Sequence, residues 1–228
     1  MAQKISVVIP AYNEEKNIEE TIRRVRKTGP EYEIIVVDDG SEDNTYEVAH
    51  NSGVRAFRLK ENRGKGAAFR KGIEEATGDI IVQVDADSQF MPEEIPKLIQ
   101  PILSDMADVT LGSRFTKGAV IEKGALGLRN RIGNYGASLL TSIACLHRVT
   151  DVQAGFKAFK SKDLKELKFK EDHFGYEPEV VILAKKKGLR ILDVPILYKK
   201  RRGGQSNINF IKDAYRISKT ILRTMLSG

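Results

Sequence analysis

The first half of the chain alternates short apolar runs with stretches in which apolar residues recur at helical spacing. The runs predict strands at residues 5–9, 33–37, 54–59, 79–84 and 108–111, and the stretches between them predict helices at 14–27, 43–51, 66–76 and 93–103. The run Ile34-Ile35-Val36-Val37 is continuously apolar, which is typical of a strand covered on both faces. This pattern predicts an α/β fold with a mostly parallel open sheet and helices on both faces.

The second half of the chain is less regular. It predicts a loop at 118–127, a helix buried on one side at 129–146, a strand at 154–159, a helix at 177–187 and a strand at 191–198. Pro195 has no backbone donor, so the last strand is expected near an edge of the sheet. A basic loop at 199–206 follows. One domain over residues 1–207 is therefore expected, with a C-terminal helix in 208–228.

This C-terminal helix combines an apolar face with a basic one. The apolar face is predicted to hold Ile211, Ala214, Tyr215, Ser218, Ile221, Leu222, Met225 and Leu226, and the basic face Lys212, Arg216, Lys219 and Arg223. Two interpretations fit: the helix packs on the domain with its basic face in water, or it anchors the protein at a membrane surface.

The charge is concentrated near the C-terminus. The net charge is +7, and residues 181–228 carry twelve Lys or Arg against Asp193 and Asp213. This asymmetry predicts an anionic partner, which could be nucleic acid, a phosphorylated substrate or an anionic membrane surface. Aromatic residues make up only 7% of the chain and do not interleave with the basic run, so nucleic acid is not expected.

The single cysteine, Cys145, excludes a disulfide framework and indicates a reducing, cytoplasmic setting. Cys145 lies in an apolar helical stretch and is expected in the core. No stretch approaches the roughly 20 apolar residues that a membrane-spanning helix needs.

Candidate metal ligands follow the apolar strand at 79–84. Asp85, Asp87 and Gln89 place two carboxylates and an amide oxygen at positions i, i+2 and i+4. Mg²⁺ and Mn²⁺ prefer such oxygen ligands, and either ion could neutralise the charge that develops on a departing diphosphate. The alternative is a solvated turn with helix-capping aspartates. The position directly after a strand favours the metal site, because ligands of open α/β sheets bind beyond the carboxyl ends of strands.

Polar residues also follow the first two strands. Asp39 is a candidate to accept a hydrogen bond from a nucleobase or a ribose hydroxyl, although Asp38-Asp39-Gly40-Ser41 also suits a simple turn. Residues 62–66, Asn-Arg-Gly-Lys-Gly, precede a helix but lack the spacing of a phosphate-binding P-loop, and no Gly-x-Gly-x-x-Gly follows the first strand. Lys65 remains a candidate phosphate contact.

Arginines downstream of the acidic motif can bind phosphate in a bidentate manner, and they are Arg114, Arg129, Arg131, Arg201 and Arg202. The three histidines have no metal-ligand spacing, and no Ser/His/Asp arrangement is present.

Taken together, these motifs resemble family 2 glycosyltransferases. The residues that carry the resemblance are Tyr12-Asn13-Glu14-Glu15, Val37-Asp38-Asp39-Gly40-Ser41, Asn62-Arg63-Gly64-Lys65-Gly66, Ala76-Thr77-Gly78-Asp79 and Asp85-Ala86-Asp87-Ser88-Gln89. Three further motifs resemble the polyprenyl-phosphate (dolichyl-phosphate) mannosyl- and glucosyltransferases: Gly112-Ser113-Arg114, Asp151-Val152-Gln153-Ala154-Gly155-Phe156-Lys157 and Arg201-x-x-Gly204-x-Ser206. The resemblance extends over residues 5–207.

The resemblance implies a GT-A (nucleotide-diphospho-sugar transferase) fold with the catalytic domain in residues 1–207. It implies inverting transfer of mannose or glucose from GDP-mannose or UDP-glucose to a polyprenyl phosphate, with a Mg²⁺ or Mn²⁺ ion, at the cytoplasmic face of a membrane. Many relatives continue into transmembrane helices, so here the basic amphipathic helix is expected to act as a peripheral anchor, or else the acceptor is soluble.

The resemblance also implies roles for single residues. The metal and the donor diphosphate would be held by Asp85, Asp87 and Gln89. The nucleotide pocket would be lined by Pro10, Tyr12, Glu14 and Asp39. The acceptor phosphate and the leaving diphosphate would be held by Arg114, Arg131 and Arg201.

The nature of the acceptor decides whether a general base is needed. A lipid phosphate is already an anion, so alignment and charge stabilisation suffice. A soluble or polysaccharide hydroxyl acceptor would need a carboxylate base, for which Glu177 or Asp151 is the candidate. A non-catalytic nucleotide- or nucleic-acid-binding protein is the third hypothesis.

Overall fold

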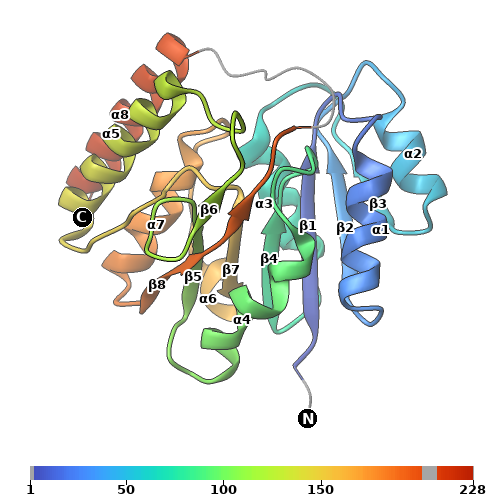
Figure 1. Ribbon diagram of the computed structural model, residues 1–228, viewed down its shortest axis with the longest axis horizontal. Coiled ribbons are helices and arrows are strands. Elements are labelled where there is room, and N and C mark those ends of the chain that lie inside the picture. The colour runs from blue at the N-terminus through green and yellow to red at the C-terminus, as the bar shows by residue number, and fades with distance from the viewer. Residues whose placement is uncertain (1–2, 202–209, 228) are drawn as a thin grey trace.

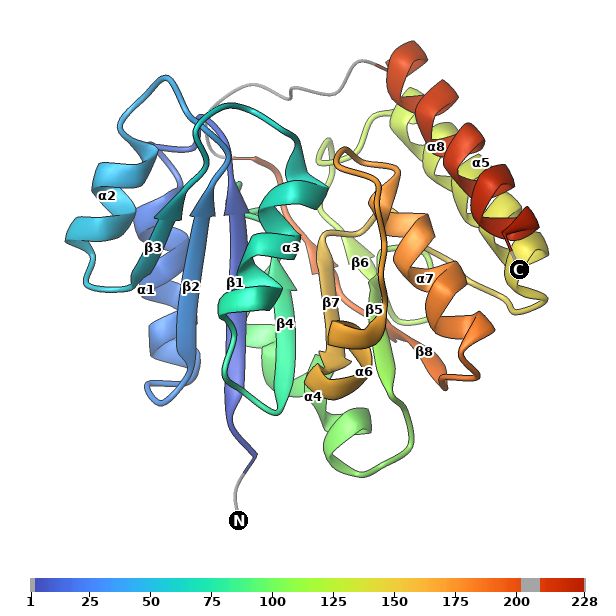
Figure 2. The same ribbon diagram turned by 180° about the vertical axis from the view of Figure 1, so that it is seen from behind.

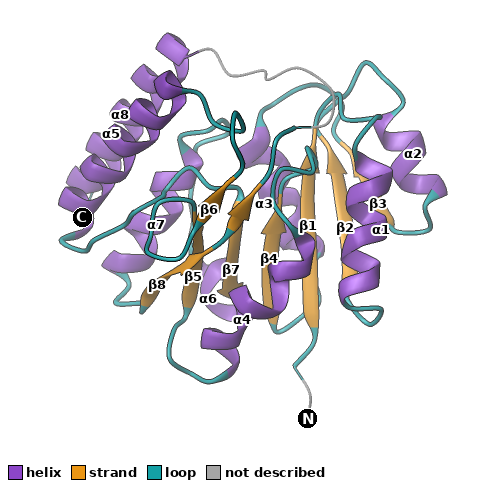
Figure 3. Ribbon diagram, viewed as in Figure 1, coloured by secondary structure: helices purple, strands orange, loops and turns teal. Residues whose placement is uncertain are grey.

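The computed structural model describes residues 3–201 and 210–227. Within these ranges a seven-stranded sheet has helices on both faces (Figure 1 and Figure 3). The strands are β1 (Ile5–Ala11), β2 (Glu33–Asp38), β3 (Arg55–Arg58), β4 (Ile80–Val84), β5 (Val109–Ser113), β6 (Val120–Ile121), β7 (Phe156–Lys160), β8 (Ile191–Pro195) and β9 (Leu197–Tyr198). The helices are α1 (Ile18–Thr28), α2 (Thr45–Asn51), α3 (Lys65–Glu75), α4 (Ile95–Leu103), α5 (Leu128–Cys145), α6 (Ser161–Glu166), α7 (Tyr176–Lys186) and α8 (Phe210–Leu226).

The strand order of the sheet is β3-β2-β1-β4-β7-β5-β8. All neighbouring pairs are parallel except those of β7, which runs antiparallel between β4 and β5. The predicted mostly parallel open sheet is therefore confirmed. Strand β8 forms one edge, as the proline in it predicted, and β6 and β9 pair in a separate small sheet.

Alternate residues of the central strands pack into two different cores. Val8 and Ile81 face α3 and α7, which lie in front of the sheet in Figure 2. Val7 and Val82 face the opposite side, where α1 and α4 pack. Because both faces of the strands are buried, both sets of positions must be apolar, which explains the continuous apolar runs in the sequence.

The boundaries differ from the prediction where local hydrogen bonds intervene. The helix predicted from residue 14 begins at Ile18, because the backbone N–H groups of Asn17 and Ile18 both donate to the carbonyl of Glu14 at 2.9 Å and form a turn. The strand predicted at 191–198 is divided at Ile196, whose N–H donates to Ser113 O at 3.1 Å. The chain then leaves the main sheet and β9 pairs with β6.

The C-terminal helix packs on the domain, against α5 and α7, but not through the face that the sequence predicted. Thr220, Ile221 and Thr224 are buried, whereas Tyr215 and Leu222 are more than half exposed. The prediction that the apolar face is the buried one is therefore wrong, because the face with Thr220 and Thr224 packs against α5 and α7 instead. The predicted boundary at residues 207 and 208 lies outside the described residues.

Glu33, at the start of β2, is expected to stabilise the fold in a pH-dependent manner. Its carboxylate accepts hydrogen bonds from Arg55 NH1 at 2.7 Å, from both the N–H and the Oγ1 of Thr77 at 2.9 Å, and from Ser6 Oγ. Burial raises the pKa of Glu33, but the hydrogen bonds from Ser6, Thr77 and Arg55 outweigh it and lower the pKa from 4.5 to about 2. The folded carboxyl is thus the stronger acid, so this stabilisation is present above pH 4.5 and is lost as the pH falls toward 2.

We therefore expect Glu33→Gln to lower the free energy of unfolding at pH 7 by about 1–2 kcal/mol, because the carboxylate remains partly accessible to water. Urea denaturation at pH 7 and at pH 3 tests this, with the exposed neighbour Glu31→Gln as the matched control. The difference between wild type and Glu33→Gln should shrink at pH 3. An equal difference at both pH values would contradict the electrostatic explanation.

Candidate active site

A cavity of about 870 Å³ opens at the carboxyl ends of β1, β2 and β4. On one side it is lined by the residues that follow these strands, and on the other by α5 and α8. Most of the predicted site residues line it: Pro10, Tyr12, Glu14, Asp39, Lys65, Asp85, Asp87, Gln89, Arg114 and Arg201.

The turn that carries the acidic motif is held by helix α1. Thr21 Oγ1 donates to the carbonyl of Ala86 at 3.1 Å and lies 2.9 Å from Ser88 Oγ. Ser88 has a φ of 61°, in the left-handed region that non-glycine residues seldom adopt. Such backbone strain clusters at functional sites and persists only when the surroundings enforce it.

Asp85 begins a chain of alternating charges that leads from the cavity to the buried Glu177 and Lys157. Lys65 Nζ lies 2.7 Å from Asp85 Oδ1 and 2.9 Å from Glu177 Oε1, and Lys157 pairs with the other oxygen of Glu177. Burial disfavours the Lys65 ammonium, yet Asp85 and Glu177 raise its pKa above the usual range. Burial likewise raises the pKa of Glu177, but Lys157 and Lys65 outweigh it and lower that pKa to about 2. Lys65 and Glu177 are therefore both charged at neutral pH.

Asp87 is short of compensating positive charge. Burial raises the pKa of its carboxyl to about 7, and the nearby Asp85 adds to the effect. Arg201 NH1 is 3.9 Å from Asp87 Oδ2, and the same guanidinium pairs with Glu14. A divalent cation would supply the missing charge.

The donor atoms around Asp87 suit a hard cation. Gln89 Nε2 donates to Lys199 O at 3.1 Å, which fixes the side-chain amide and identifies the other atom as an acceptor oxygen. Two carboxylates and an amide oxygen are the kind of ligands that Mg²⁺ and Mn²⁺ take. Within residues 3–201 and 210–227, no group of three or more His, Cys, Asp or Glu side chains could hold a metal, so a cation held by Asp85 and Asp87 would need a further ligand such as the Gln89 oxygen or a phosphate.

Asp39 both holds a neighbouring loop in place and lines the cavity. Its two carboxylate oxygens accept the backbone N–H groups of Arg63 at 2.9 Å and Gly64 at 2.8 Å. The carboxylate thus ties the end of β2 to the loop before α3, and it lines the cavity beside that loop.

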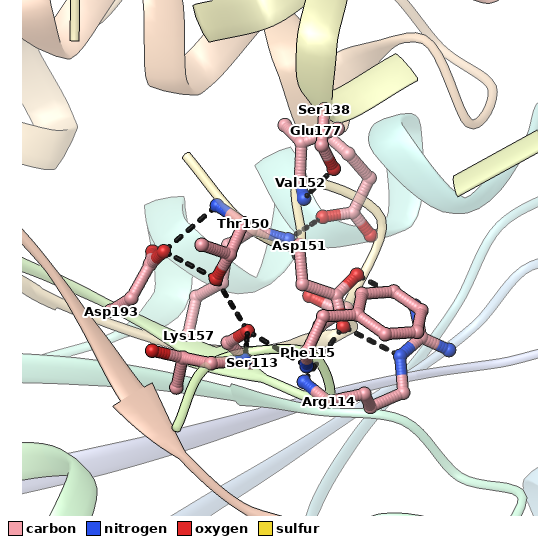
Figure 4. A network of polar contacts seen from close by, with 12 residues as sticks. Ser113, Arg114, Phe115, Ser138, Thr150, Asp151, Val152, Lys157, Glu177 and Asp193 are labelled. Atoms are coloured by element: carbon pink, nitrogen blue, oxygen red, sulfur yellow. Dashed lines mark hydrogen bonds and ion pairs between the residues drawn. The ribbon is translucent and has the colours of Figure 1, made fainter. Parts of the chain in front are cut away.

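Arg114 is held in a buried ion pair (Figure 4). Its Nε and NH2 donate to the two oxygens of Asp151 at 2.6 and 2.8 Å, and its guanidinium lies over the ring of Tyr198, 4.9 Å from the ring centroid. Burial disfavours the charged guanidinium, but Asp151 raises the pKa of Arg114 above its usual value. Thr150 continues the network to Ser113 and Asp193.

The segment after Asp151 forms the wall behind Asp85. A Cβ on Gly155 would lie 2.0 Å from Asp85 Oδ2, so only glycine leaves room for the carboxylate. Gln153 lines the cavity, and its buried Nε2 has no hydrogen-bond partner among the described residues. The motif from Asp151 to Phe156 therefore shapes the site through its backbone as well as through its side chains.

Three predicted residues lie elsewhere. Arg131, near the start of α5, lines a smaller neighbouring hollow with Phe115 and Tyr135 instead of the main cavity. The two candidate bases, Glu177 and Asp151, are buried in the ion pairs described above and do not line the cavity. Gly204 and Ser206 of the last motif, and the basic Arg202 beside them, lie outside the described residues.

Several cavity residues were missed in the sequence. Gln153 lies in a motif that was noticed, but its orphaned amide becomes evident only in three dimensions. Asn134 on α5 and Phe174 just before α7 line the cavity because α5, α7 and α8 pack together, and no local pattern marked them. Arg216 was expected on the basic face of the C-terminal helix but not in the cavity.

Comparisons with known proteins identify relatives of this chain. The chain is 36% identical over 245 residues to the UDP-N-acetylglucosamine–dolichyl-phosphate N-acetylglucosaminyltransferase of Methanococcus voltae, covering 95% of this chain and 96% of the relative. It is 33% identical to the dolichol-phosphate mannosyltransferase of Pyrococcus furiosus, covering 95% of this chain and 64% of that protein.

Among solved structures, glucosyl-3-phosphoglycerate synthase from Mycobacterium tuberculosis, in complex with Mn²⁺, uridine diphosphate and glucosyl-3-phosphoglycerate, superposes with a TM-score of 0.77 at 25% identity. The match covers 98% of this chain and 80% of the other. The expected GT-A type of fold is thereby confirmed. The model of the family described as glycosyl transferase family 2 matches residues 6–168. With that match and these relatives, the chain belongs to glycosyl transferase family 2, and it is a glycosyltransferase.

Proposed function

We propose that this enzyme transfers a hexose, with inversion, from a nucleotide sugar to a polyprenyl phosphate. The observation that carries the proposal is the composition of the cavity at the carboxyl ends of β1, β2 and β4. The carboxylates of Asp85 and Asp87 lie in one part of it, beside Arg201, and the cationic side chains of Lys212 and Arg216 lie on the wall formed by α8. A divalent cation with a donor diphosphate fits the first part, and an anionic acceptor fits the second.

Asp85, Asp87 and Gln89 would hold the Mg²⁺ or Mn²⁺ ion, which would neutralise the charge that develops on the departing nucleoside diphosphate. The match to a synthase solved with Mn²⁺ and uridine diphosphate supports this assignment. Arg201 lies between Glu14 and Asp87, where its guanidinium can stabilise the same diphosphate. Tyr12, Pro10 and Asp39 would contact the nucleoside.

The placement of the two candidate bases favours an acceptor that is already anionic and needs no base. Glu177 and Asp151 are each committed to buried cations and do not line the cavity. A phosphate acceptor needs no deprotonation, so alignment of its oxygen with the anomeric carbon is the main requirement. Relatives named as dolichyl- and undecaprenyl-phosphate sugar transferases support a lipid phosphate. Arg114 at the cavity wall and Arg131 in the neighbouring hollow stay candidates for the acceptor phosphate.

A soluble phosphorylated acceptor is the second candidate. The similar structure of glucosyl-3-phosphoglycerate synthase was solved with a soluble phosphorylated compound, glucosyl-3-phosphoglycerate. Only the first candidate requires the enzyme to work at a membrane surface. The protein would then work as a peripheral enzyme at the cytoplasmic face of a membrane.

The test is transfer of labelled sugar from GDP-mannose, UDP-glucose or UDP-N-acetylglucosamine, with Mn²⁺ or with EDTA. Polyprenyl phosphate in liposomes is compared with the matched polyprenol, which lacks the phosphate, and with 3-phosphoglycerate. We expect a metal-dependent lipid-linked sugar from the phosphate alone. Product from 3-phosphoglycerate and none from polyprenyl phosphate would replace the first candidate by the second.

A further inference from the structure

Helix α5 leaves one complete apolar face in solvent. Its exposed apolar residues follow one another at intervals of four, three, four and four residues, so they lie along one side of the helix. We call this set the α5 stripe: Leu128, Ile132, Tyr135, Leu139 and Ile143, with Leu146 directly after the helix. Their exposed fractions run from 55% for Tyr135 to 93% for Leu146. The opposite side of the helix, with Ala137 and Thr141, is buried.

The α5 stripe does not contribute to the hydrophobic core, because its side chains are exposed. Single exposed apolar residues are ordinary, but a contiguous exposed set on one helix marks a surface that binds something. Helix α8 lies beside α5 in both Figure 1 and Figure 2, and the two helices are in contact. It adds the exposed Tyr215, Leu222 and Leu226 to the same end of the molecule.

The charged residues on α5 and directly beside it are all basic. Residues 123–150 contain no Asp or Glu, but they include Lys123, Arg129, Arg131 and Arg148. Helix α8 exposes Lys219 and Arg223 as well. An apolar face flanked by Lys and Arg matches the boundary between acyl chains and anionic headgroups.

A second copy of the chain fits this surface less well. A two-fold contact would place the same patch on itself, and therefore bring two basic bands together. No helix in the described parts of the chain has the length and hydropathy to cross a bilayer. The features of α5 are those of a helix that lies in the interface plane.

The same helices form one wall of the cavity. Asn134 and Leu140 of α5 and Arg216 and Ile217 of α8 line it. A surface that holds α5 and α8 on a bilayer would thus place the cavity wall next to the headgroups, where the phosphate of a polyprenyl phosphate lies. This last step rests on the proposed function; the membrane contact itself does not.

We propose that the α5 stripe, together with the exposed residues of α8, docks the enzyme on an anionic lipid bilayer. Helix α5 carries most of the apolar contact, and α8 contributes both apolar and basic residues. The sequence pattern had placed the anchoring function on α8 alone.

Flotation of the full-length protein with vesicles tests this without donor or acceptor. The vesicles contain phosphatidylglycerol and phosphatidylcholine in equal parts, and pure phosphatidylcholine serves for comparison. We expect the wild type to bind the anionic vesicles more strongly. The triple variant Ile132→Ser, Leu139→Ser and Ile143→Ser should bind about tenfold or more weakly, because apolar area no longer leaves water. None of these three side chains lines the cavity.

Met106→Ser is the matched control, because Met106 is 63% exposed and Leu139 is 62% exposed, but Met106 follows α4 instead of lying on α5. A thermal melt confirms that the triple variant is folded. Absence of vesicle binding by the wild type, or equal binding by the triple variant, would overturn the proposal. So would a wild-type dimer that the triple variant dissociates, since the stripe would then join two copies. Transfer to a short, water-soluble polyprenyl phosphate tests the proposed function separately.

Discussion

Asp87→Asn is expected to lower kcat/KM for sugar transfer by about a thousandfold, because the amide retains the shape of the side chain but removes a charge that the metal and diphosphate require. Asp87 has the carboxyl whose pKa burial raises to about 7. The site therefore concentrates negative charge that the protein alone does not balance. A steady-state assay over a range of Mn²⁺ concentrations should show both a lower kcat and a higher metal requirement.

The stability of this variant distinguishes a chemical role from a structural one. Removing a poorly compensated buried charge should leave the free energy of unfolding unchanged or raise it, as is common when active-site residues are replaced. Glu19→Gln, on the exposed side of α1, removes one negative charge elsewhere and should change neither property. Wild-type activity in Asp87→Asn, or a loss of activity that follows a loss of stability, would contradict the assignment.

Gly155→Ala is expected to lower kcat/KM by about a hundredfold, because a displacement of a catalytic group by about 1 Å is enough for such a loss. The new Cβ would lie 2.0 Å from one carboxylate oxygen of Asp85 and 2.1 Å from the other. Asp85 would have to leave its position beside Lys65, so the apparent affinity for the metal should fall along with kcat.

Gly127→Ala serves as the control for this substitution, since a Cβ there meets nothing within 4 Å and Gly127 has a φ of −69°. Metal titration followed by a donor-hydrolysis assay compares the two variants. If Gly155→Ala bound the metal as the wild type does, Asp85 would not be a ligand that the glycine protects. A thermal melt separates displacement of Asp85 from general loss of the fold.

The residues after β1, β2 and β4 could be predicted from sequence because one physical rule brings them together. Parallel neighbouring strands end at the same edge, so Glu14, Asp39 and Asp85 had to meet once the strands were identified. The structure places β1 between β2 and β4, and the cavity contains all three residues.

The other wall of the site depends on packing between distant elements. Residues of α5 and α8 reach the cavity because these helices pack against each other and against α7, and no local spacing encodes that contact. Arg131 is an example of a residue whose position could not be predicted. It lies on α5 and lines the hollow with Phe115, whereas Asn130 and Asn134 of the same helix line the cavity. Likewise, Asp151 and Glu177 looked available as bases until their buried cationic partners were located.

The antiparallel strand β7 has a consequence for how the chain acquires its shape during synthesis. Strand β4 pairs on one side with β1, but its other neighbour is β7, and residues 85–155 separate the two in the chain. An emerging N-terminal half therefore carries an open hydrogen-bonding edge on β4 until β7 leaves the ribosome, and open edges invite pairing with other chains. Strand β4, which leads into the acidic motif, is thus the strand whose free edge is covered late in synthesis. Truncation before residue 156 would leave this edge exposed, and such fragments should aggregate.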